Sequence, residues 1–185
     1  MIDEKVREIK KELRLAMNGV VSSIQRNHGL NYKINFGVEI PRLKDIATKF
    51  EKDEKLAKRL WQDNIRECKM LAIFLMPESG YTDVAEQWIT EAPFTEIADH
   101  LTMVVLSKLP DAPKKAVEWI QNEEGMFRYC GFMTLTHLFR RGIKLDKELE
   151  NTYLATAKNI EELENRKTVI IAAYNSLGHF IDEEE

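Results

Sequence analysis

The 185-residue chain is long enough to bury the core of one compact domain. Its 31% charged and 44% hydrophobic residues exclude a disordered chain, and its net charge of −4 argues against indiscriminate binding to nucleic acid or to an anionic membrane. The charge is uneven, because residues 1–52 hold 11 Lys/Arg against 7 Asp/Glu, residues 78–124 hold 3 against 10, and residues 126–147 hold 5 against 1. A local basic face is therefore compatible with the composition.

The predicted elements are helices throughout the chain. Apolar residues at the three- and four-residue spacing of an amphipathic helix run from about residue 3 to 27, and His28-Gly29 ends that helix. After a non-helical segment, Pro41 begins a helix that extends to about residue 52. Further helices are predicted in DEKLAKRLWQ, NIRECKMLAIFLM, YTDVAEQWITEA, PFTEIADHLTMVVLSKL, APKKAVEWIQNE, MFRYCGFMTLTHLF, DKELENTYLATAKN and NRKTVIIAAYNSLGHFI. We expect about ten helices, no strand and a single all-α domain over residues 1–185.

Three of these segments, which begin IRECK, FRYCG and NRKTV, superpose without gaps. Arg66, Arg128 and Arg166 then share one position at the head of a second helix. A permanent cation is seldom buried without a partner, so we expect each arginine to bridge to an adjacent repeat or to loop carbonyls. Helical pairs that recur in this way stack into a continuous core. The pattern predicts an all-α, right-handed α–α superhelix of the HEAT-like solenoid type, with an ordinary helical bundle as the rival.

The tryptophans and cysteines are predicted to lie in the core. Trp61, Trp88 and Trp119 stand in first helices of the pairs, where large side chains fill space. Cys68 and Cys130 lie in apolar helical patterns without metal-ligand spacing, which indicates reduced thiols. The charged N-terminus lacks a secretory signal, and no apolar run reaches the ~18–20 residues that span a bilayer. We expect a cytoplasmic protein with no cofactor, no metal and no membrane partner.

Asp99 is the candidate acidic residue of the chain. It lies at the edge of the apolar stripe of the helix that begins near Phe94, where a carboxylate can serve as an acid or base facing a groove. The alternative is a solvated or arginine-paired aspartate. No nucleophile motif, phosphate loop or zinc motif accompanies it, and the four histidines are scattered.

Two early segments, NFGVEIPRLKDIATKF and AKRLWQDNIRECKMLAIFLM, are followed by FTEIADHL and MFRYCGFMTL. In this order and spacing they resemble the AlkD-like DNA alkylation repair family over about residues 30–180. The resemblance implies a HEAT-like superhelix whose concave face binds duplex DNA. In active members, an acidic residue and aromatic side chains near a cationic alkylated purine bring about its excision, and an arginine helps to hold the DNA backbone.

When the functional residues of active members are carried over by position, this chain keeps only some of them. Asp99 keeps the acidic residue, whereas Thr95, Tyr129 and Asn175 stand where the aromatic residue, the arginine and a second tryptophan are expected. A shift of one residue would put Arg128 in the place of the arginine. The resemblance thus implies a member that lacks most catalytic residues and binds DNA or a protein partner on its concave face. The candidate residues are Asp99 for catalysis and, for DNA binding, Arg66, Arg128, Tyr129, Arg166 and Asn175.

Two other functions compete with this interpretation. One is an active DNA glycosylase that releases alkylated purines through Asp99. The other is a protein–protein scaffold, which the acidic region between residues 78 and 124 favours.

Overall fold

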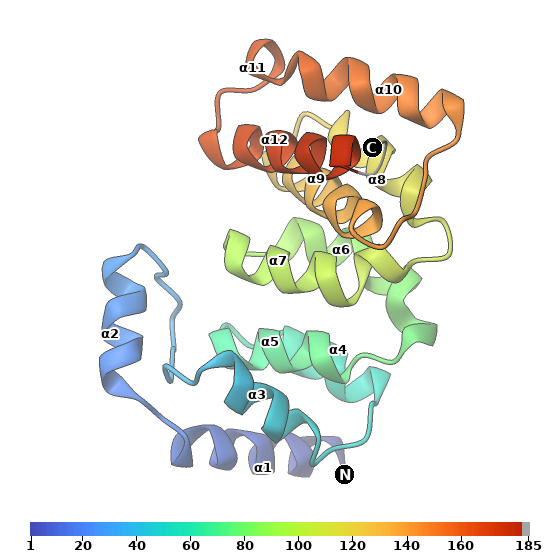
Figure 1. Cartoon of the computed structure of the whole chain (residues 1–185). Coiled ribbons are helices and arrows are strands. Elements are labelled where there is room, and N and C mark those ends of the chain that lie inside the picture. The colour runs from blue at the N-terminus through green and yellow to red at the C-terminus, as the bar shows by residue number, and fades with distance from the viewer. Residues whose placement is uncertain (183–185) are drawn as a thin grey trace. The chain divides into compact units, whose positions relative to one another are not determined.

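A computed structural model describes residues 1–182 of the chain (Figure 1). Within those residues it contains twelve α-helices, two short 3-10 helices and no β-strand, so the predicted all-α class is confirmed with two helices more than expected. The chain divides into two compact units, Met1–Tyr81 and Thr82–Glu185. The expectation of a single repeat domain stays a prediction.

The first unit is built around its last helix. Its elements are α1 (Ile2–Leu15), α2 (Gly19–Asn27), α3 (Ile40–Ala47), α4 (Glu54–Trp61), α5 (Arg66–Leu75) and the 3-10 turn η1 (Glu78–Gly80). Helix α5 packs against α3 and α4, and α4 also packs against α1. Nine of the ten residues of α5 are buried, so this helix forms the core of the unit. Helix α3 begins near Pro41 as predicted but stops short of residue 52.

The predicted helix over residues 3–27 is wrong in one respect, because Asn18 divides it into α1 and α2. The Asn18 side chain accepts hydrogen bonds from the first backbone N–H groups of α2, at 3.1 and 3.2 Å. This is an N-cap, which starts a new helix in a new direction. The apolar stripe is thereby interrupted, and Val20 and Ile24 are exposed rather than buried. Helix α2 ends as predicted, with Gly29 in the left-handed conformation at a φ of 87°.

The second unit surrounds helix α9. Its elements are α6 (Tyr81–Glu91), α7 (Thr95–Val104), η2 (Leu106–Lys108), α8 (Ala112–Ile120), α9 (Gly125–Phe139), α10 (Lys147–Lys158), α11 (Ile160–Leu163) and α12 (Lys167–Asp182). Helix α9 packs against α7, α8 and α12. Gly131 lets α8 and α9 approach closely, since a Cβ atom there would lie 2.8 Å from the carbonyl oxygen of Ala116. Helices α7 and α12 thus both lie against α9.

The predicted core side chains are where the sequence pattern indicates. Trp61, Trp88 and Trp119 are buried, and Cys68 and Cys130 are buried free thiols. Over residues 1–182, no helix has the length and apolarity needed to cross a membrane. The same residues include no group of three or more His, Cys, Asp or Glu side chains that could hold a metal ion.

Candidate functional site

The three arginines of the gapless superposition occupy three different structural positions. Arg66 is the first residue of α5, Arg128 is the fourth residue of α9, and Arg166 immediately precedes α12. Helices α5 and α9 begin at Arg66 and Gly125, which are 59 residues apart, whereas the superposition assumed an offset of 62. The predicted equivalence is therefore wrong for Arg128 by about one helical turn, whereas Arg66 and Arg166 differ by one residue in their place at the helix start.

Lys69, rather than Arg66, is the structural counterpart of Arg128. Lys69 Nζ donates to the carbonyl oxygen of Trp61 at 2.9 Å, and Arg128 Nε donates to that of Ile120 at 3.1 Å. Each acceptor is the last residue of the preceding helix, eight positions earlier in the chain. The two cations thus tie the two helices of a pair together in the same way. The expected bridge to a backbone carbonyl is thus present for Arg128.

Arg66 fastens a loop inside the first unit. Its side chain is only 2% exposed, and Nη1 lies 2.9 Å from the carbonyl oxygen of Val38 and 3.2 Å from Glu67 Oε1. The Glu67 carboxylate in turn accepts hydrogen bonds from the backbone N–H groups of Phe36 and Val38. The guanidinium of Arg66 is consequently held within the protein and is not presented to a ligand.

Arg128 has a similar structural role in the second unit. Its Nη1 donates to the carbonyl oxygen of Leu163 at 2.8 Å and to Glu164 Oε2 at 3.2 Å. Arg166 Nη1 donates to the same carboxylate oxygen at 3.0 Å, but its side chain is 51% exposed. Burial raises the pKa of Glu164, yet backbone hydrogen bonds from Arg166 and Asn165 and the charges of both guanidinium groups lower it below its ordinary value. Arg128 is thus locked in place, while Arg166 is half in solvent.

Asp99 and Tyr129 meet between α7 and α9. Tyr129 Oη donates a hydrogen bond of 2.5 Å to Asp99 Oδ1. Burial raises the pKa of Asp99, although the hydrogen bond from Tyr129 and the charge of His100 oppose that shift. Burial and the hydrogen bond to Asp99 also raise the pKa of Tyr129 above its ordinary value, so the phenol stays a neutral donor at physiological pH. The position beside Asp99 is therefore filled by Tyr129, and Arg128 faces elsewhere.

These two side chains line a hollow of about 200 Å³ together with Asn175 of α12. The carry-over by resemblance assigned Asp99, Tyr129 and Asn175 to functional positions, and the structure brings all three together. Met133 and Ile171, which add apolar surface, were not anticipated. Met133 lies one helical turn from Tyr129, and Ile171 one turn from Asn175, so helix periodicity was the signal that could have found them.

A second hollow of about 370 Å³ adjoins the first, since Tyr129 and Thr168 line both. Thr95 and Arg166 also line it. Five residues that the resemblance or the arginine pattern singled out thus converge in the second unit: Thr95, Asp99, Tyr129, Arg166 and Asn175. Arg128 is turned away from both hollows.

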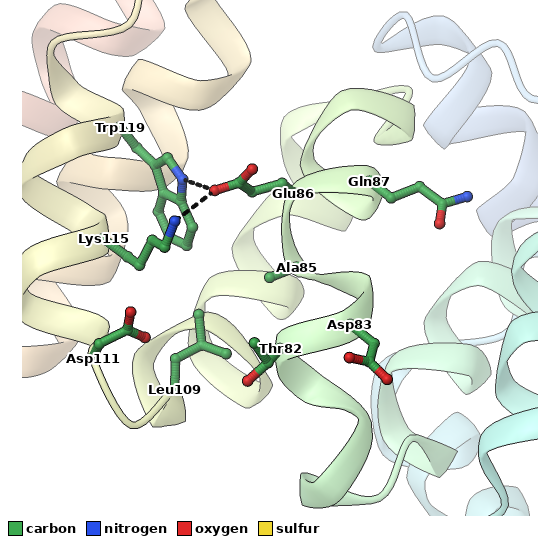
Figure 2. Close-up of a pocket in the computed structure, with 9 residues that line it drawn as sticks. All are labelled: Thr82, Asp83, Ala85, Glu86, Gln87, Leu109, Asp111, Lys115 and Trp119. Carbon is green, nitrogen blue, oxygen red and sulfur yellow. Dashed lines mark hydrogen bonds and ion pairs between the residues drawn. The ribbon is translucent and has the colours of Figure 1, made fainter.

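Another pocket, of about 290 Å³, lies between α6 and α8 and is negatively charged (Figure 2). Glu86 Oε1 accepts from Lys115 Nζ at 3.0 Å and from Trp119 Nε1 at 3.5 Å, and the hydrogen bond from Lys115 lowers the pKa of Glu86. Asp83 and Asp111 add two further carboxylates to the lining. Such a pocket repels a polyanion, so it is no candidate for a DNA site.

Residues 9–175 match the family model described as DNA alkylation repair enzyme. A solved structure described as belonging to "a new family of proteins related to the HEAT-like repeat DNA glycosylases with affinity for branched DNA structures" is similar to the chain, with a TM-score of 0.80 at 20% sequence identity. The match covers 94% of this chain and 74% of that chain, and it confirms the predicted HEAT-like fold. Among proteins with curated descriptions, none matches the chain. The match of the family model to residues 9–175, which is most of the chain, shows that the chain belongs to the DNA alkylation repair enzyme family.

Proposed function

We propose that the protein binds branched DNA and does not excise alkylated purines. The binding half of the proposal is supported by family membership and by a relative of the same fold that has affinity for branched DNA structures. The other half is carried by one observation, the hydrogen bond from Tyr129 to Asp99.

This hydrogen bond reduces the negative charge on Asp99, the carboxylate that the family chemistry requires. A glycosylase must stabilise positive charge that develops on the sugar, which calls for a carboxylate whose negative charge faces the reacting nucleotide. Here Tyr129 holds Asp99 Oδ1 at 2.5 Å and draws charge toward the phenol. Asp99 therefore has less negative charge to offer than an uncommitted aspartate.

The aromatic walls of an excision site are also missing. Of the described residues that line the two hollows, only Tyr129 is aromatic. Tyr174 precedes Asn175 in α12, but its Oη donates to Glu161 at 2.7 Å and its side chain does not line either hollow. A cationic purine would thus find little aromatic surface to rest against.

The first unit supplies the positive charge that a DNA complex needs. It holds 16 Lys/Arg against 12 Asp/Glu, whereas residues 82–185 hold 11 against 19. Residues 13–38 contain no acidic residue at all, and Arg14, Arg26 and Lys33 in this segment are exposed. Phosphate contacts dominate the affinity of proteins for DNA, so we expect this segment to carry a large share of the binding.

The test is a titration of a fluorescent four-way junction and of a linear duplex of equal length, read by anisotropy at several salt concentrations. We expect the junction to bind more tightly. The double variant Arg14→Gln/Lys33→Gln should weaken binding to both DNAs and reduce the slope of log K against log salt by about 2. The variant Lys114→Gln removes an exposed lysine from the acidic second unit and serves as the control. Equal affinity for junction and duplex would refute branch selectivity.

A second assay separates binding from excision. The protein is incubated with methylated duplex DNA, and released base is measured. We expect no release. Release that disappears in Asp99→Asn would instead establish the glycosylase, and failure to bind any DNA in the titration would favour the protein–protein scaffold.

A further inference from the structure

We infer that the two adjoining hollows around Asp99 and Tyr129 hold one unpaired nucleotide, with its base beside Asp99 and its phosphate at Arg166. This inference rests on the proposed binding of branched DNA and adds the ligand that the site would take at the branch.

The first hollow has the size and surface of a site for a single base. Its volume of about 200 Å³ corresponds to six or seven waters at roughly 30 Å³ each, which is room for one ring system and not for a base pair. Met133 and Ile171 supply apolar walls, and Ile171 remains 57% exposed on α12. Thioether sulfur and branched alkyl groups pack well against the faces of flat rings, and a base lifted from its stack needs such a surface.

The polar groups of the same hollow match the hydrogen-bonding edge of a base. Tyr129 engages Oδ1 of Asp99, which leaves Oδ2 to accept from a ring N–H or an exocyclic amine. Asn175 is exposed at the hollow and offers an amide that both donates and accepts. A paired base has its Watson–Crick edge engaged with its partner, so only an unpaired base can present that edge to these groups.

Arg166 and Glu124 line the second hollow, and the partly exposed guanidinium of Arg166 is the group there that can meet a phosphate. Its side chain is 51% exposed and pairs with Glu164 Oε2 at 3.0 Å. Arg128 holds the same oxygen at 3.2 Å, so Arg166 can swing to a ligand without leaving the buried Glu164 carboxylate unpaired. In its present position Arg166 lies against Gly125, since a Cβ atom there would be 2.7 Å from Arg166 Cδ. Arg166 can thus contact a phosphate while Arg128 continues to neutralise Glu164.

Two junctions of the same sequence test the inference. One is fully paired, and the other carries a single unpaired 2-aminopurine at the branch point. Anisotropy of a distant dye measures affinity, and 2-aminopurine emission reports the environment of the base. We expect the unpaired nucleotide to tighten binding roughly tenfold, the scale of removing about 55 Å² of apolar surface from water against Met133 and Ile171, and its emission to change on binding.

Variants of residues that line the hollows test whether the preference for the unpaired nucleotide arises there. Ile171→Ala/Asn175→Ala and, separately, Arg166→Gln should each reduce the ratio of the two junction affinities, measured with the same variant, from about tenfold to about one. Ile143→Ala trims an exposed apolar side chain outside the hollows and should preserve the preference. Equal affinity for the two junctions, with unaltered 2-aminopurine emission, would overturn the inference while the proposed branch binding stands. Failure to bind either junction would overturn both.

Discussion

Two arginines that hold the same carboxylate oxygen should differ several-fold in their contribution to stability. Arg128 and Arg166 place Nη1 at 3.2 and 3.0 Å from Glu164 Oε2, so their pairing distances are nearly the same. Their side chains are 10% and 51% exposed, respectively. Replacement of each by methionine keeps most of the apolar stem and removes the charge. The two replacements therefore differ in the burial of the ion pair and in the two backbone carbonyls to which Arg128 donates.

The structure sets the expected magnitudes. Arg128→Met removes the ion pair and leaves the carbonyl oxygens of Ile120 and Leu163 without the guanidinium donor. Breaking a buried pair costs about 3–5 kcal/mol, and the lower end applies because Arg166 and two backbone N–H groups still hold Glu164. Arg166→Met breaks a half-exposed pair, which is worth about 0–1 kcal/mol.

Thermal unfolding followed by circular dichroism measures the difference. A loss of about 3 kcal/mol corresponds to a fall in Tm of roughly 6–12 °C for a chain of this size, and a loss below 1 kcal/mol to at most about 4 °C. Urea unfolding at pH 7 checks that the order of the two variants is the same at 25 °C. Equal losses in the two variants would refute the reasoning, because the deeper burial of Arg128 and its two carbonyl hydrogen bonds would then contribute nothing to stability.

Three further changes test the site and the packing. Tyr129→Phe should lower the free energy of unfolding at pH 7 by about 1–2 kcal/mol, because a hydrogen bond to a carboxylate is lost; in the Asp99→Asn background urea unfolding should show a smaller loss. Gly131→Ala should destabilise by about 1–3 kcal/mol, since its Cβ meets the Ala116 carbonyl; an unchanged Tm would contradict that close approach. The pKa of Glu164 lies below its ordinary 4.5, so its stabilising contribution is present above that pH and disappears as the pH falls through the folded-state value. Glu164→Gln should therefore flatten the decline of Tm between pH 6 and pH 3, and a parallel decline in both proteins would argue against this role.

The positions of most helices could be predicted because their apolar faces repeat with the helical period. The division of the first predicted helix at Asn18 could not, since apolar residues continue at helical spacing on both sides of it. A side-chain cap decides the break there, and periodicity does not register caps. Helix α11 was missed for a different reason, because its four residues are too few to show a period.

The residues of the candidate site could be predicted, but the directions in which their side chains point could not. Resemblance placed Asp99, Tyr129 and Asn175 correctly enough that all three line one hollow. It left open whether Arg128 or Tyr129 faces Asp99, because neighbouring residues of a helix point about 100° apart. The choice follows from partners that are distant in sequence, namely the Leu163 carbonyl and the Glu164 carboxylate that hold Arg128.

The two buried cysteines fall one in each compact unit, which makes them natural probes of local opening. Burial raises the pKa of Cys68 to about 12 and raises that of Cys130 as well, so almost no thiolate is present at pH 8 while the protein stays closed. A disulfide reagent then reacts only through transient opening, and its rate reports the free energy of that opening. Because Cys68 belongs to Met1–Tyr81 and Cys130 to Thr82–Glu185, mass spectrometry of partly modified protein can follow each unit separately without an added label.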